Sequence, residues 1–225
     1  MDYIKKPPIL PTLLLLGIAF SAAPPASAAA PLTPGELEAM LDQEHMAELA
    51  DGEVIMLQRE AAREDGGTKG RGTAVVMINR PKREVWEQLT DFESHPEYMP
   101  RVTQYKTYFD DGNVQGHRMT MKIVWRKITA HIVHELDPEK GVVTWHLDES
   151  KENDIEATEG AWVLLPHGAE KCIVAYSVKV DSGMRVPQFI ENFLMRQDLP
   201  KVPKALKRRV ETAAGVYEED APEQR

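Results

Sequence analysis

The chain has 225 residues, of which 42% are hydrophobic and 28% are charged, and its formal net charge is −9 at pH 7. This composition is typical of a globular protein with enough apolar residues for a substantial core. The acidic balance argues against a nucleic-acid partner, because nucleic-acid-binding surfaces neutralise phosphates with Lys and Arg.

The first residues predict an export signal. Lys5 and Lys6 precede an apolar run at residues 13–20, and Ala26-Ser27-Ala28 supplies the small residues of a cleavage site. Prolines on both sides of the run leave too little apolar helix for an uncleaved membrane anchor. We therefore predict a signal peptide at residues 1–28, cleavage after Ala28 and a periplasmic location.

A helical segment is predicted next, within residues 29–52. Thr33-Pro34-Gly35-Glu36 has the pattern of a helix start. Apolar residues follow at the spacing of one helix face: Leu37, Met40, Leu41 and Met46. We expect this segment to pack on the outside of the domain.

Two strands are predicted at residues 54–62 and 73–79, separated by the glycine-rich stretch 64–72. This stretch lacks the GxxxxGK[ST] order, and no helix begins directly behind it. We therefore interpret it as a hairpin turn and not as a phosphate-binding loop.

Two short helices are predicted after the strands. Pro81 begins the first, and Ser94-His95-Pro96-Glu97 has the S-x-x-E form of a capping box for the second, which Pro100 ends. The buried stripe of the first helix is predicted to be Val85, Trp86 and Leu89. Three further side chains are expected to point toward the surface that the helices cover: Phe92, Tyr98 and Met99.

An antiparallel meander is predicted from residue 101 onward. The apolar positions are odd-numbered up to Trp125 and even-numbered from Ile128, so the apolar face changes phase between them. We place the chain reversal at Arg126-Lys127. Further strands are predicted at residues 142–148, 156–165 and 171–181.

The last predicted element is a helix that opens at Val186-Pro187. Pro200 and Pro203 are expected to bend or break it before residues 205–210 continue. Residues 214–225 form an acidic tail that we expect to be disordered. A sheet with one apolar face needs helices to cover it, so the order of elements predicts an α+β domain.

Several motifs resemble those of START-like proteins of the SRPBCC superfamily, in the polyketide cyclase/dehydrase and coenzyme-Q-binding group. Asn79-Arg80-Pro81 and Tyr98-Met99-Pro100 resemble the first motif of that group, and Gly160-Ala161-Trp162 resembles its G-x-W strand. Val186-Pro187 and the basic stretch Leu206-Lys207-Arg208-Arg209 resemble its closing helix. The resemblance covers residues 53–213 and implies a helix-grip fold, in which a curved antiparallel sheet wraps around a long C-terminal helix.

The resemblance also implies an enclosed pocket for a hydrophobic molecule. Alternation along the strands, together with the closing helix, gives the candidate pocket residues: Met99, Met119, Met121, Ile123, Trp125, Ile132, His134, Trp145, Trp162, Tyr176, Phe189 and Phe193. Tryptophans and flexible methionines suit an adaptable apolar pocket with a few polar groups.

No metal site, cofactor or catalytic residue is predicted. His131 and His134 are three apart on a strand and so face opposite sides, which differs from the helical HExxH arrangement. The single cysteine, Cys172, lies on an apolar strand face and is expected to be buried and inert.

The leading functional hypothesis is an exported carrier or sequestering protein for an isoprenoid, quinone, sterol-like or fatty compound. One alternative is a cyclase or aromatase that uses Tyr176, His134 or Arg118, although Arg118 falls on the polar face. Another is a protein-interaction domain with a filled core, which would use residues 34–50 or 201–209. A transient membrane contact through the basic stretch 201–209 stays open, as does the oligomeric state.

Overall fold

The computed structural model describes residues 31–60, 70–123, 126–181 and 198–212. The predicted signal peptide, Trp125, Phe189, Phe193 and the acidic tail lie outside the described residues. All the described residues belong to one compact unit. Within them, no helix is both long enough and apolar enough to cross a membrane.

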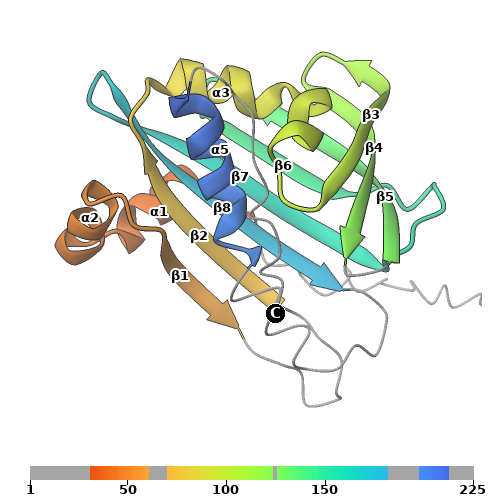
Figure 1. The fold of residues 1–225 in the computed structure, drawn as a ribbon, viewed down its shortest axis with the longest axis horizontal. Coiled ribbons are helices and arrows are strands. Elements are labelled where there is room, and N and C mark those ends of the chain that lie inside the picture. Colours follow the sequence, from red (N-terminus) through yellow and green to blue (C-terminus); the bar gives the residue numbers. More distant parts are fainter. Residues whose placement is uncertain (1–30, 61–69, 124–125, 182–197, 213–225) are drawn as a thin grey trace, which may run out of the picture. The chain divides into compact units, whose positions relative to one another are not determined.

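A curved antiparallel sheet of eight strands forms the centre of this unit (Figure 1). Its order is β1-β2-β8-β7-β6-β5-β4-β3, so the early strand β2 lies beside the late strand β8. The strands are β1 Ile55–Glu60, β2 Gly70–Ile78, β3 Val102–Asp111, β4 Val114–Ile123, β5 Arg126–Asp137, β6 Val142–Leu147, β7 Ala157–His167 and β8 Lys171–Asp181. The predicted antiparallel meander and the pairing of the first two strands are confirmed.

The helices lie on both sides of this sheet (Figure 1). They are α1 Pro34–Met40, α2 Gln43–Ala50, α3 Lys82–Thr90, the 3-10 helix η1 Phe92–Glu97 and α5 Lys201–Glu211. On what we call the inner face, α3, η1 and α5 cover a cluster that includes Val76, Trp162 and Val174. On the outer face, Leu37 of α1 and Leu49 of α2 pack in a second cluster. The expected position of the N-terminal segment outside the inner core is confirmed.

The N-terminal segment is helical as predicted, but two helices occupy it, so its apolar residues do not share one helix face. Leu41 is extended and ends α1, and Asp42 then begins α2 by accepting a hydrogen bond from the His45 N–H at 2.9 Å. An N-cap side chain satisfies one of the free amides at a helix start, so Asp42 favours a new helix over continuation of the first.

The capping box at Ser94 was also predicted wrongly. The helix η1 begins at Phe92, two residues earlier, and the Ser94 hydroxyl donates to the Asp91 carbonyl at 2.8 Å. Glu97 instead lies 3.0 Å from Arg209 of α5. The predicted burial is nevertheless confirmed, since Phe92, Tyr98 and Met99 are all buried.

The chain reversal after β4 lies two residues earlier than predicted. Ile123 pairs with Arg126, so residues 124–125 connect the strands and Arg126-Lys127 begins β5. The phase change was correct, because Met119 lies opposite Ala130 and both belong to the inner core or pack against it. Arg126 and Lys127 are exposed at the strand end, where a charged pair is as acceptable as in a turn.

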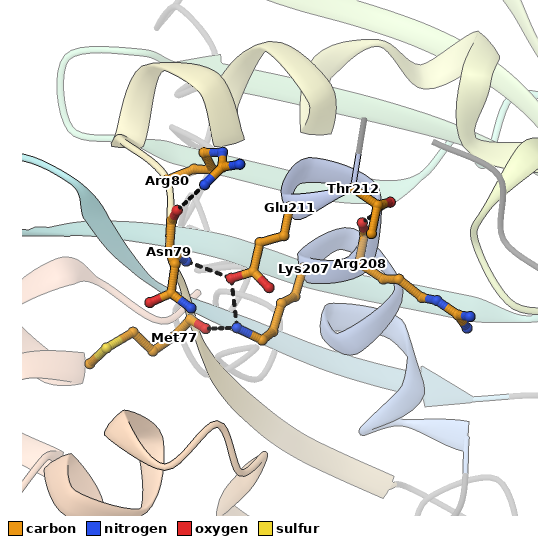
Figure 2. Close-up of polar contacts among 7 residues, drawn as sticks. All are labelled: Met77, Asn79, Arg80, Lys207, Arg208, Glu211 and Thr212. Atoms are coloured by element: carbon orange, nitrogen blue, oxygen red, sulfur yellow. Dashed lines mark hydrogen bonds and ion pairs between the residues drawn. The ribbon is translucent and has the colours of Figure 1, made fainter. Parts of the chain in front are cut away.

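Pro203 does not break the last described helix, contrary to the prediction. Pro200 is the N-cap of α5, and Pro203 lies in its first turn, where an amide needs no partner within the helix. Near its start, Asp198 pairs with Arg101. Near its end, Glu211 and Lys207 bind the end of β2, as Figure 2 shows. The helix is therefore held to the domain at both ends.

Candidate functional site

A row of aromatic side chains runs along the inner face of the sheet. The ring centroids of Trp162 and Tyr176 lie 4.5 Å apart, and Trp145 stacks on Tyr176 at 5.5 Å with an interplanar angle of 14°. Gly160 lies opposite Trp145 in the register, and a Cβ at Gly160 would overlap the indole ring. The glycine of the G-x-W motif therefore provides the space in which Trp145 lies flat on the sheet.

The row continues into a cluster of histidine and tyrosine side chains. His134 lies 6.5 Å from Trp145 between ring centroids. Its Nδ1 is 3.1 Å from the Nδ1 of His117, and its Nε2 is 3.2 Å from the Tyr105 hydroxyl. Three polar side chains from β3, β4 and β5 thus form one buried hydrogen-bonded chain.

The helical cover contributes further rings to this cluster. Phe92 of η1 lies 4.3 Å from His134 and 4.4 Å from His117 between ring centroids. The Nε2 of His95 donates to the Leu89 carbonyl at 2.8 Å, and the Tyr98 hydroxyl donates to the Gln88 carbonyl at 3.1 Å. These bonds satisfy the carbonyls at the end of α3 and fix η1 against the sheet.

The polar groups of the cluster are uncharged near neutral pH. Burial lowers the pKa of His95 and of His117 from the ordinary 6.5 to about 4. Burial lowers the pKa of His134 well below its ordinary value, and the neighbouring His117 and His95 lower it further. Burial raises the pKa of the Tyr105 and Tyr176 hydroxyls above their ordinary range.

The structure brings most of the described candidate pocket residues together. Met99, Ile132, Trp145 and Trp162 are buried in the inner core, and Met119 and Tyr176 are half-buried against it. His134 is buried among the rings described above. Met121 and Ile123, toward the end of β4, are half-buried.

Sequence reasoning missed His117, Tyr105 and His95. His117 has the same odd-numbered phase as Met119, and that alternation was the signal that could have found it. Tyr105 lies opposite Met119 in β3, a pairing that becomes visible only once the register is known. His95 is buried within η1, which begins at Phe92 and not at Ser94 as the sequence indicates.

Most of the inner core is buried, and other apolar side chains that pack against it are half-buried. Side chains such as Val76, Leu89 and Leu206 have no exposed surface. The half-buried side chains lie on the sheet, as do Met119, Tyr176 and Val178, and also on the helical cover, as do Trp86, Val202 and Val210.

A pocket of about 390 Å³ lies at the end of β6 and the start of β7. Its lining includes Leu147 and Thr158 together with His146, Glu159 and Lys179. The Lys179 ammonium and the Glu159 carboxylate form an ion pair at 2.8 Å. None of the candidate pocket residues lines this pocket, and its lining contains charged side chains as well as Leu147 of the inner core.

The other residues singled out from the sequence, His131, Cys172 and Arg118, do not contribute to the aromatic and histidine cluster of the inner face. His131 points away from His134 and contacts the backbone of Glu152 and the side chain of Asn153. Cys172 is buried, and burial raises the pKa of its thiol to about 12. Arg118 is exposed and donates to Gln104. No group of three or more potential metal ligands is found among the residues that the structure describes.

Comparison with protein families identifies this arrangement. The profile of the family "polyketide cyclase / dehydrase and lipid transport" matches residues 78–207, more than half of the chain. The chain belongs to this family. The matched range begins at the end of β2 and extends into α5, so it includes most of the sheet and the inner-face helices. No curated protein matches the chain.

Solved structures of the START superfamily share the fold of this family member. A STAR-related lipid transfer protein from Xanthomonas axonopodis has a TM-score of 0.58 at 17% identity, covering 71% of this chain and 93% of its own. A START superfamily protein from Mycobacterium smegmatis has a TM-score of 0.56 at 18% identity, covering 64% and 98%. The Zhui aromatase/cyclase from Streptomyces sp. R1128 has a TM-score of 0.54 at 20% identity, covering 66% and 100%.

Proposed function

We propose that this protein is an exported carrier or sequestering protein that binds one hydrophobic small molecule or lipid against the inner face of its sheet. The observation that supports this most is the aromatic row Trp162-Tyr176-Trp145 on the inner face, with the half-buried Met119 packed against the same core. Pockets for small hydrophobic molecules are lined mainly by aromatic and apolar side chains with a few polar groups, and the inner face supplies such side chains. The Xanthomonas relative is named as a lipid transfer protein, which agrees with this proposal.

Binding would be driven by removal of apolar surface from water. Each 100 Å² of apolar area that leaves water contributes roughly 2.5 kcal/mol before the costs of association are subtracted. An isoprenoid, quinone, sterol-like or fatty compound has enough apolar area for useful affinity by this means alone. Export is supported by the signal-like pattern of residues 1–28 and places the carrier in the periplasm.

The test is native mass spectrometry of the mature protein, residues 29–225, purified from the periplasm and then extracted with organic solvent. The proposal expects a stoichiometric apolar compound in the extract, or saturable uptake when lipid and quinone probes are added. A protein that carries nothing and takes up none of the probes would overturn the proposal.

A pair of adjacent variants locates the binding surface. Met119→Trp places a larger side chain on the half-buried inner face, and we expect it to reduce probe binding at least severalfold. Arg118→Trp makes the same change on the exposed outer face of β4 and serves as the control. Equal effects of both variants would place the ligand elsewhere.

An enzyme of the cyclase type is the second candidate, and the Tyr105-His134-His117 chain favours it. Neutral imidazoles joined to a phenol can move a proton to or from a bound molecule. Conversion of an added polyketide-like aromatic precursor, followed by mass spectrometry, tests this candidate.

An interaction role for residues 34–50 is not favoured, because α1 and α2 bury Leu37 and Leu49 against the sheet.

A further inference from the structure

The pocket at the end of β6 and the start of β7 has the size of a small-molecule site. Its volume is about 390 Å³. The pairing of β6 with β7 ends at His146 and Glu159, although β6 continues to Leu147 and β7 begins at Ala157. Leu147, Ala157 and Thr158, which follow the last pair, contribute to the lining. A molecule bound between these strand ends would break no strand pairing.

Thr158 supplies the pocket with a hydroxyl that has no protein partner. The residue is only 8% exposed, and its side chain makes no hydrogen bond to any residue that the structure describes. Among the described residues, the Thr120 hydroxyl is the one polar side-chain atom that is both fully enclosed and unbonded. The Thr158 hydroxyl therefore keeps accessible surface, and Thr158 lines the pocket. A buried polar group of this kind indicates a partner from outside the chain.

Two carboxylates directly after β6 bring negative charge to the same pocket. Asp148 accepts hydrogen bonds from the Ser150 hydroxyl at 2.6 Å and from the Tyr108 hydroxyl at 2.7 Å. These bonds hold the pKa of the Asp148 carboxyl below its ordinary value, so it is ionised at neutral pH. Glu149 is exposed and makes no hydrogen bond or ion pair within the described part of the chain. Its carboxylate is therefore available to a ligand.

Two other charged residues of the lining compensate each other. Lys179 and Glu159 lie opposite each other on β8 and β7, and their charged groups are 2.8 Å apart. A ligand would meet this pair as a neutral unit. The Asp148 and Glu149 carboxylates are then the lining groups that favour one charge in a ligand, and they favour a cation.

The backbone that carries these carboxylates is fixed to the sheet. The Asp148 N–H donates to the His131 carbonyl at 2.7 Å, and the Asp148 carbonyl accepts from the Asn153 side chain at 2.9 Å. The Asp154 N–H donates to the Thr129 carbonyl at 2.9 Å. This wall of the pocket needs little ordering when a ligand binds, which lowers the cost of association.

We propose that this pocket binds a small aliphatic amine, whose ammonium group donates hydrogen bonds to the Thr158 hydroxyl and the Glu149 carboxylate. Asp148 adds negative charge to the same end of the ligand. The methylene groups of the amine would contact Leu147 and Ala157. This site is separate from the inner-face site, and the inference does not depend on the proposed function.

The experiment is an NMR titration of the mature protein, residues 29–225, at neutral pH and low ionic strength. The ligands are butylamine, butanol and butyrate, which share a chain length and differ in charge. We expect butylamine to shift the backbone amide signals of Glu149 and Thr158 saturably. It should bind about five- to tenfold more tightly than butanol, which is the value of one charge-assisted hydrogen bond in a partly open site. Butyrate is expected to bind more weakly than butanol.

Glu149→Gln removes the charge and keeps the size of the side chain. We expect it to weaken butylamine binding about fivefold and to leave butanol binding within about twofold. Glu170→Gln is the matched control, because Glu170 is exposed in the turn at the other end of β7. It should leave the binding of both ligands unchanged.

Thr158→Val keeps the shape of the side chain and removes its hydroxyl. We expect it to weaken butylamine and butanol alike, each by about threefold or more. Thermal unfolding checks that the variant folds. Because Glu149 is exposed, Glu149→Gln still tests the site if Thr158→Val does not fold.

Three results would overturn the inference. They are the absence of saturable butylamine shifts at Glu149 and Thr158, butyrate binding as tightly as butylamine, and equal effects of Glu149→Gln and Glu170→Gln. None of them bears on the inner face, where uptake of lipid and quinone probes is measured separately. A failure of the carrier proposal would likewise leave the amine site standing.

Discussion

The Nδ1 atoms of His117 and His134 lie 3.1 Å apart on neighbouring strands and share one hydrogen bond. One ring must donate and the other must accept, so at least one of the two has to be neutral. A second proton would make both nitrogens donors and break the bond. The packing of Phe92 against both rings leaves little room for them to separate. This pair therefore makes the core sensitive to acid.

We predict that the free energy of unfolding falls as the pH is lowered from 6.5 toward 4. Unfolded histidines take up protons near pH 6.5, whereas His95 and His117 in the folded chain do so only near pH 4. Between these values the unfolded chain binds more protons, so the stability present above pH 6.5 is lost on acidification. For His95 the shift corresponds to about 3 kcal/mol. Urea unfolding across this pH range measures the slope.

His95→Gln separates this effect from the titration of carboxylates. The Gln side-chain amide can still donate to the Leu89 carbonyl but takes up no proton, so we expect a shallower slope between pH 6.5 and 4. The exposed His167→Asn is the control and should keep the wild-type slope. An unchanged slope in His95→Gln would show that His95 does not contribute.

A second prediction concerns Gly160, on which Trp145 lies. A Cβ at this position would overlap both the Trp145 indole and the Ser177 carbonyl oxygen of the neighbouring strand. Because the carbonyl belongs to the sheet backbone, it cannot move away cheaply. We expect Gly160→Ala to destabilise the fold by about 1–3 kcal/mol and to change the tryptophan fluorescence.

Gly35→Ala is the matched control for this substitution. Gly35 lies in α1, and nothing lies within 4 Å of the position that its Cβ would occupy. Alanine favours a helix over glycine, so we expect stability to stay equal or rise by up to about 1 kcal/mol. If Gly160→Ala were as harmless as Gly35→Ala, the Trp145 ring would not lie where the structure places it.

Much of the fold was predictable because its signals are local. Alternation identified the strands of the meander and the burial of Ile132, Trp145 and Trp162, and the phase change located the β4-β5 reversal within two residues. The starts of the short helices were harder to predict, since a single capping residue decides where such a helix begins. Asp42 begins a new helix and η1 begins at Phe92, and neither outcome follows from apolar spacing.

The histidine chain was less predictable, because it depends on register between strands. His134 was found from its apolar phase, but its partners come from β3 and β4, and only the pairing of those strands brings Tyr105 and His117 to it. A polar residue on an apolar face indicates a partner but does not name it. The ligand candidates Trp125, Phe189 and Phe193 stay predictions.

A third prediction concerns the pair Arg101-Asp198 near the start of α5. Arg101 has a φ of 64°, which is unusual for a residue other than glycine, and its guanidinium pairs with the buried Asp198. We expect Arg101→Ala to cost about 3 kcal/mol, since it removes the nearer of two cations beside a buried carboxylate and leaves the more distant Lys201 at 3.6 Å. Arg101→Gly should cost about 1 kcal/mol less, because glycine adopts this φ freely.

A double-mutant cycle with Asp198→Ala measures the coupling between the two side chains. We expect a coupling energy above about 1 kcal/mol, since the residues are in direct contact and largely buried. Additive effects would mean that the ion pair does not hold α5. Equal stability of the Ala and Gly variants at position 101 would contradict the strain expected at a φ of 64°.

A fourth prediction concerns the opposite end of α5, shown in Figure 2. The Glu211 carboxylate accepts hydrogen bonds from the Asn79 backbone N–H and from the Lys207 ammonium, each at 2.7 Å. Lys207 also donates to the Met77 carbonyl at 2.8 Å. We expect Glu211→Ala to destabilise the fold by about 1–2 kcal/mol, because the Asn79 backbone N–H loses this acceptor and Lys207 loses one of its two acceptors.

Hydrogen exchange distinguishes this anchor from an ordinary surface ion pair. In Glu211→Ala the backbone amide hydrogen of Asn79 should exchange faster with solvent, because it is bonded to the Glu211 side chain and not to a neighbouring strand. Glu87→Ala is the control: it removes the exposed Arg83-Glu87 pair, which should cost less than about 0.5 kcal/mol and leave exchange at the Asn79 backbone amide unchanged.

Because the anchor joins α5 to the end of β2, its loss should also loosen the helical cover of the inner face and speed the release of a bound probe. A Glu211→Ala protein with wild-type exchange at Asn79 and wild-type probe release would show that α5 is held by its apolar face alone.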